Sequence, residues 1–137
     1  MDSATEYLLD VSAEMNAGYT FDCVHHACAL AKLLTDEGRR PWIGRMGEAI
    51  ESEKGVFHMP LTPARFTGKQ ARTWTTHYVC CEGNDVYDPI AGTPLPIERY
   101  AEAVFGRALP VEEHFSADAT ADLLQRGALR QSFRRTG

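Results

Sequence analysis

Cys23, His77 and Asp88 are the residues of this chain whose types could together attack a carbonyl group. A thiol becomes an efficient nucleophile when a nearby imidazole takes its proton. The imidazole works best when a third group fixes its tautomer and stabilises its charged form, and a carboxylate suits that role. Because the three residues lie far apart in the sequence, this chemistry depends on the elements that would bring them together.

Cys23 lies in the first turn of a helix predicted from Asp22 to Gly38. Asp22 can cap the free N–H groups of that turn, and Gly38 can end the helix in the left-handed conformation. The face of Cys23 continues through Ala27, Leu30, Ala31 and Leu34. A helix start carries partial positive charge, which favours the nucleophilic thiolate. The alternative interpretation is that Cys23 is a small core residue, because free cysteines are among the most buried side chains.

A β-hairpin is predicted with one strand over residues 73–81, a turn around Gly83 and a partner strand over residues 86–88. A two-residue loop and a four-residue loop give the same register. The expected pairs are Cys81 with Val86, Val79 with Asp88, and His77 with Ile90. This register makes His77 and Asp88 diagonal neighbours on the more apolar face, at a distance where they can hydrogen-bond. Without such a partner, a carboxylate on that face would be costly to bury.

His26 competes with His77 for the role of base, because it lies one helical turn beyond Cys23. A helix N-terminus disfavours the imidazolium that a general base must become, so we favour His77. The remaining histidines have no evident partner in the sequence and are expected at the surface; they are His25, His58 and His114.

The other expected elements frame this site. They are an amphipathic helix over residues 4–17, a strand over 41–46, a strand over 56–59, a helix over 97–105 closed by Gly106, and a short helix from Ser116 to Leu124. Residues 47–72 otherwise read as an irregular connection, where we expect substrate selection to lie. The C-terminal arginines are expected in a solvated, partly frayed tail.

The composition is that of one soluble globular domain of 137 residues, and the expected helices and strands make it an α+β domain. Its formal net charge of −5 argues against a general nucleic-acid binder. No apolar run is long enough to span a bilayer, so we expect no membrane partner. Residues 1–6 lack the order of a secretory signal. Cys80 and Cys81 are adjacent and face opposite ways on a strand, which favours free thiols and a reducing compartment. We therefore expect a cytoplasmic protein, with delivery as an effector without a signal peptide left open.

The order of these features resembles the papain-like and transglutaminase-like cysteine enzymes. The matching pieces are Cys23 at the start of its helix, His77 within Thr76-His77-Tyr78-Val79, and Asp88 within Val86-Tyr87-Asp88-Pro89. The resemblance covers about residues 19–105 and implies N-terminal helices packed on a small antiparallel sheet, followed by a C-terminal helical tail over 107–137. It also implies that Cys23 is the nucleophile, His77 the base and then the acid, and Asp88 the orienting carboxylate.

The function implied by this resemblance is a cysteine hydrolase that acts on amide bonds of peptide or protein substrates through an acyl-enzyme, with no cofactor and no metal. It would be a peptidase or a side-chain deamidase. Papain has an oxyanion-donating glutamine where this chain has Ala17, so only the backbone N–H of Cys23 is assigned as a donor.

Three alternatives stay open beside the hydrolase. One is an acyltransferase of the transglutaminase type, and another is an inactive binding or immunity module of the same fold. The third is a zinc site formed by Cys23, His26, Cys28 and either Cys80 or Cys81, although their spacing does not follow the usual pattern for zinc ligands. The oligomeric state is not predicted.

Overall fold

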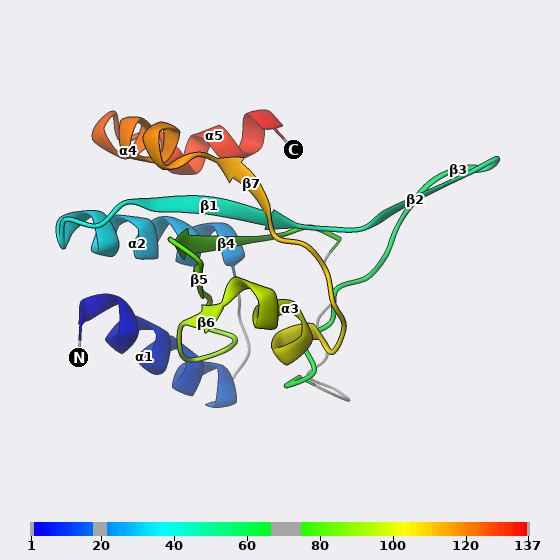
Figure 1. The fold of residues 1–137 in the computed structure, drawn as a ribbon, viewed down its shortest axis with the longest axis horizontal. Helices are drawn as coiled ribbons and strands as arrows, with labels where there is room; N and C mark the ends of the chain where they lie inside the picture. Colours follow the sequence, from blue (N-terminus) through cyan, green and yellow to red (C-terminus); the bar gives the residue numbers. More distant parts are fainter. Residues whose placement is uncertain (1, 18–21, 67–74, 137) are drawn as a thin grey trace.

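The computed structural model describes residues 2–17, 22–66 and 75–136, and in this part of the chain it is an α+β fold with five helices. The helices are α1 (Ser3–Ala17), α2 (Cys23–Asp36), α3 (Ile97–Phe105), α4 (Ala117–Gln125) and α5 (Leu129–Thr136). The strands are β1 (Pro41–Met46), β2 (Ala49–Ser52), β3 (Gly55–His58), β4 (His77–Glu82), β5 (Asp85–Tyr87), β6 (Leu95–Pro96) and β7 (Glu112–Phe115). Five of these strands form an antiparallel sheet in the order β6-β5-β4-β1-β7, as Figure 1 shows.

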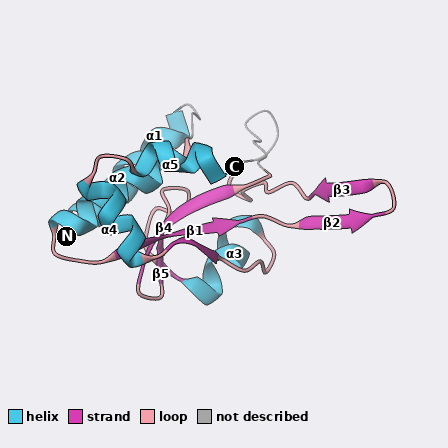
Figure 2. Ribbon diagram, turned by 90° about the horizontal axis from the view of Figure 1, so that it is seen from above, coloured by secondary structure: helices cyan, strands magenta, loops and turns pink. Residues whose placement is uncertain are grey.

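Helices cover both faces of the sheet. Helices α1, α2, α4 and α5 lie on one side and α3 on the other (Figure 2). The two buried clusters follow this division except at Met15 of α1, which packs in the cluster that contains α3. Cys80 packs in the cluster that contains α2, while Val79 and Cys81 pack in the cluster that contains α3. The prediction that Cys80 and Cys81 face opposite ways is confirmed, and all four cysteines are free thiols. Strand β4 therefore joins the two halves of the core.

Helix α2 begins and ends as its sequence predicts. The Asp22 carboxylate accepts a hydrogen bond from the backbone N–H of His25 at 3.1 Å, which caps the first turn. At the other end Gly38 has a φ of 81°, a conformation that glycine adopts without steric cost. The predicted apolar face is buried at Ala27, Leu30, Ala31 and Leu34. Cys23 is thus held at the start of a well-anchored helix.

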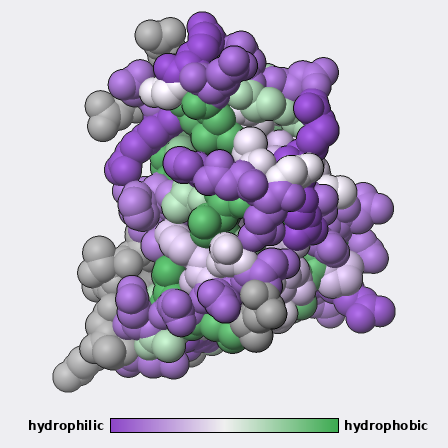
Figure 3. Space-filling model, turned by 90° about the vertical axis from the view of Figure 1, so that its left-hand side faces the viewer, coloured by the Kyte–Doolittle hydropathy of each residue, from purple (hydrophilic) through white to green (hydrophobic). Residues whose placement is uncertain are grey.

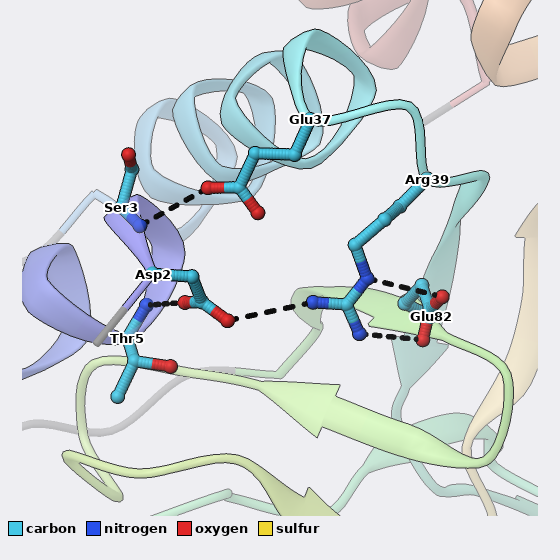
Figure 4. Close-up of polar contacts among 6 residues, drawn as sticks. All are labelled: Asp2, Ser3, Thr5, Glu37, Arg39 and Glu82. Carbon is cyan, nitrogen blue, oxygen red and sulfur yellow. Dashed lines mark hydrogen bonds and ion pairs between the residues drawn. The ribbon is translucent and has the colours of Figure 1, made fainter.

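A cluster of charged side chains fastens the end of α2 to α1 and to β4 (Figure 4). The guanidinium of Arg39 donates to both carboxylate oxygens of Glu82, at 3.2 and 3.0 Å, and lies 3.6 Å from the Asp2 carboxylate. Glu37 accepts from the backbone N–H of Ser3 at 3.0 Å. These contacts fix the far end of α2 relative to the strand that carries His77. The surrounding face is mostly hydrophilic, with hydrophobic residues visible between the hydrophilic ones (Figure 3).

The β4–β5 hairpin has the register that the sequence predicts, over a shorter length. Cys81 pairs with Val86, and Glu82 pairs with Asp85 on either side of the turn. Strand β5 ends at Tyr87, so Asp88 follows the ladder directly and begins a turn closed by the Ala91 N–H. The strand expected from residue 73 begins only at His77; residues 73 and 74 lie outside the described part, and residues 75 and 76 are not in a strand.

Two regions differ from the sequence-based expectations. Residues 49–58, expected to contain one strand, form the two-stranded hairpin β2–β3, which projects from the body in Figures 1 and 2. Its residues are all exposed, so there is no burial pattern for the sequence to reveal. The C-terminus is not a frayed tail as far as Phe133, because β7 pairs with β1 and α5 buries Leu129 and Phe133. Among the described helices none has the length and apolar character needed to cross a membrane.

Replacing Phe133 by alanine tests this role of α5. Phe133 is 5 % exposed in the cluster beneath α2, so Phe133→Ala should lower the free energy of unfolding by about 3 kcal/mol. Phe57, which is 53 % exposed on the β2–β3 hairpin, is the matched control, and Phe57→Ala should cost less than about 1 kcal/mol. Urea denaturation measures both values, and equal losses would contradict the assignment of α5 to the core.

Candidate active site

Cys23 is the first residue of α2 and is half-buried. Its neighbour Asp22 caps the helix and also accepts a hydrogen bond from Arg130 of α5 at 3.1 Å. Arg130 in turn lies 3.3 Å from Nδ1 of His25. The helix start that presents the Cys23 thiol is therefore held by its own cap and by the C-terminal helix.

His77 and Asp88 form a buried pair, as the hairpin register predicts. Nε2 of His77 lies 2.9 Å from Oδ2 of Asp88, and the two residues are 0 % and 1 % exposed. His77 is the first residue of β4, and Asp88 follows the last residue of β5. The ring of Phe105, from α3, packs edge-on against the imidazole with 5.5 Å between ring centroids. The pair is thus closed off by α3.

The Asp88 carboxylate is surrounded by donors. The backbone N–H of Ile90 donates to Oδ1 at 3.0 Å, and the hydroxyl of Tyr100 donates to Oδ2. Burial by itself would raise the pKa of Asp88, but the charge and hydrogen bond of His77, together with the bonds from Tyr100 and Ile90, hold that pKa below its ordinary value. The carboxylate is therefore ionised at neutral pH.

His77 is protonated more readily than an ordinary histidine. Burial acts to lower its pKa, but the charge and hydrogen bond of Asp88 outweigh burial, and a hydrogen bond and charge interaction with Cys23 add to the rise. The result is a pKa of about 9. The structure therefore brings Cys23, His77 and Asp88 together. Because Nε2 binds Asp88, Nδ1 is the ring nitrogen that can exchange a proton with the thiol.

One ring nitrogen of His26 is engaged by helix α1. Its Nδ1 lies 2.6 Å from the hydroxyl of Tyr7 in α1, and burial lowers its pKa. His58 is exposed, as expected, and His25 is exposed beside Arg130. His114 differs from the expectation, since it is half-buried and stacks against Phe133 with 5.8 Å between ring centroids.

The other three thiols are poorly suited to nucleophilic chemistry at neutral pH. Burial raises the pKa of Cys28 to about 11 and that of Cys81 to about 12, and burial raises the pKa of Cys80 well above its ordinary value. Within the described ranges no group of three or more histidine, cysteine or acidic side chains could hold a metal ion. The described residues thus do not assemble the zinc site that the sequence left open.

Residues 18–21 and 67–74, which precede Cys23 and His77, lie outside the described part of the chain. A groove of about 420 Å³ beside α3 and another of about 390 Å³ between α2 and the α4–α5 segment are lined by other residues. Asn16, next to the position of the papain glutamine, accepts a hydrogen bond from Arg65 at 2.8 Å. The backbone N–H of Cys23 stays the one assigned candidate for an oxyanion donor.

Tyr100 and Phe105 contact the buried pair, and the sequence does not single them out as site residues. Tyr100 shares one face of the helix over 97–105 with Ile97, Ala101 and Val104, and the apolar character of that face makes its burial predictable. The contact of Tyr100 with Asp88 is not predictable from the sequence, because it depends on where α3 lies on the sheet.

Comparisons of the chain with protein-family models, with curated proteins and with solved structures find no significant match. The assignment of this site therefore depends on its own geometry.

The raised pKa of His77 makes the stability of the protein depend on pH. The folded state keeps a proton that the unfolded chain releases near its ordinary pKa of 6.5. The stabilisation is therefore complete below about pH 6.5 and is lost as the pH rises through about 9. We expect the urea-derived free energy of unfolding to fall by roughly 3 kcal/mol over this window on account of His77.

Asp88→Asn is the matched variant for this measurement. It removes the charge that raises the pKa of His77, so this part of the pH dependence should disappear. The buried thiols also titrate in alkaline solution, but they are common to both proteins and cancel in the difference. Parallel curves for the two proteins between pH 6 and pH 9.5 would show that the pair does not titrate as described.

Proposed function

We propose that this protein is a cysteine hydrolase of the papain-like or transglutaminase-like type that acts on amide bonds in peptide or protein substrates. The observation that carries the proposal is the buried pair of His77 and Asp88 beside a thiol at the first residue of a helix. The chain order supports the same class: the cysteine begins a helix, the histidine begins β4, and the aspartate directly follows the adjacent antiparallel strand β5.

The proposed reaction begins with Cys23 and His77 sharing one proton. That proton resides on His77, where Asp88 stabilises the imidazolium, so the sulfur of Cys23 reacts as the thiolate. The thiolate attacks the carbonyl carbon, and the negative oxygen of the tetrahedral intermediate faces the backbone N–H at the start of α2. His77 then donates the proton to the departing nitrogen, the carbon–nitrogen bond breaks, and a thioester to Cys23 is left.

The second half of the reaction returns the enzyme to its starting state. His77 accepts a proton from a water molecule, whose oxygen attacks the thioester carbonyl. The carbon–sulfur bond breaks, the carboxylic acid leaves, and the shared proton returns to the pair. An amine in place of water would make the protein an acyltransferase of the transglutaminase type. A peptide-bond substrate would make it a peptidase, and a glutamine or asparagine side chain would make it a deamidase.

Selective alkylation tests the nucleophile. In the folded protein at pH 7, iodoacetamide should modify Cys23 at least about ten times faster than Cys28, Cys80 or Cys81, because the raised pKa of each of those three thiols keeps it protonated. Peptide mapping by mass spectrometry gives the four rates. Protein unfolded in urea is the control, in which the four rates should converge. His77→Gln should remove most of the advantage of Cys23.

The same experiment separates the enzyme from the binding module. If Cys23 reacts no faster than the other three thiols, the result contradicts the hydrolase proposal and favours an inactive module of the same fold. For a reactive Cys23, incubation with a mixed peptide library shows by mass spectrometry whether backbone cleavage or side-chain deamidation occurs. Either activity should be absent from Cys23→Ala.

A further inference from the structure

Tyr100 contacts the buried pair at the Asp88 oxygen that also binds His77. The residue is 0 % exposed, and its hydroxyl donates a hydrogen bond to Oδ2 of Asp88. That same oxygen lies 2.9 Å from Nε2 of His77, while Oδ1 accepts from the Ile90 N–H at 3.0 Å. Tyr100 and His77 therefore share one carboxylate oxygen.

Helix α3 is tied to the hairpin that carries the pair, which keeps Tyr100 in register with it. The first residue of α3, Ile97, donates its backbone N–H to the carbonyl of Asn84 in the β4–β5 turn at 2.7 Å. Just before the helix, β6 pairs with β5 through Leu95 and Val86. Beyond Tyr100, Phe105 packs edge-on against the imidazole. One short helix thus contacts both members of the pair.

Two donors on one carboxylate oxygen compete for its charge. The hydrogen bond from the Tyr100 hydroxyl stabilises the Asp88 carboxylate more when His77 is neutral than when the carboxylate is already paired with a charged imidazolium. The hydroxyl therefore stabilises the state with neutral His77 more than the state with charged His77. It also favours the ionised carboxylate over a neutral pair in which the proton has moved to Asp88.

We propose that Tyr100 is a positioning residue that keeps Asp88 ionised and limits how tightly Asp88 holds the proton of His77. The inference deepens the proposed function, and its catalytic meaning rests on it: an imidazolium bound too tightly by Asp88 would be a poor acid for the departing nitrogen. With Tyr100 in place, Asp88 orients the ring and stabilises its charge, yet His77 can still release the proton. The residue acts through Asp88 and does not touch the thiol's substrate.

The direction of a titration shift distinguishes this role from simple packing. In Tyr100→Phe the ring stays and the hydroxyl is lost, so the midpoint for His77, followed by NMR of histidine-labelled protein, should rise by about half a unit to one unit. If Tyr100 only filled space around the pair, the remaining phenyl ring would fill that space equally well and the midpoint would not rise. An unchanged or lowered midpoint therefore overturns the inference. His77→Gln identifies the resonance.

Tyr87→Phe is the matched control. Tyr87 is 4 % exposed and directly precedes Asp88, but its ring belongs to the opposite cluster and lies beneath the Arg39 guanidinium, 5.7 Å from it. Its loss should leave the His77 midpoint where it is, and a comparable rise in this variant would also count against a specific role for Tyr100. Circular dichroism of both variants verifies that they fold.

The outcome is separable from the fate of the proposed function. A raised midpoint in Tyr100→Phe together with an unreactive Cys23 would remove the hydrolase and keep the control of His77 by Tyr100. A reactive Cys23 with an unmoved midpoint would remove the inference alone.

Discussion

A buried carboxylate needs an opposite charge or several hydrogen-bond donors beside it, and Asp88 has three such partners. His77, Tyr100 and the Ile90 N–H all contact its two oxygens. Leaving such a group without partners would cost several kcal/mol, comparable to a large part of a domain's net stability. Elements from the sheet, from the turn after β5 and from α3 therefore have to meet at this point for the fold to be stable.

Strand β4 is where this requirement connects to the rest of the molecule. Along it, successive side chains enter the cluster beneath α2 and the cluster beneath α3, and its first residue is His77. Helix α2 packs on the same strand, with its far end fastened through Arg39 and Glu82. The position of Cys23 relative to His77 is thus a result of helix-on-sheet packing and does not rely on a loop. This is the kind of rigid placement that nucleophilic chemistry needs.

The parts of the site that could be predicted from sequence are those governed by local rules. The hairpin register follows from turn length, so the proximity of His77 and Asp88 could be deduced before the fold was known. The cap at Asp22 and the end at Gly38 follow from residue type. The prediction failed where distant segments decide the outcome. Strand β7 contains charged residues and forms by pairing with the edge of β1. The hydroxyl of Tyr100 contacts Asp88 only because α3 packs at that place on the sheet.

The β2–β3 hairpin does not pack against the core of the protein. It belongs to a separate two-stranded sheet, and its apolar residues Ile50, Val56 and Phe57 are 46 %, 56 % and 53 % exposed. A ladder of two strands without a packed face has little beyond its own hydrogen bonds to hold it closed. We therefore expect its backbone amides to exchange with solvent deuterium through local opening, at a free energy far below that of global unfolding, whereas the amides of β1 and β4 should exchange only when the whole domain unfolds. On this view the hairpin can open and close while the five-stranded sheet stays intact.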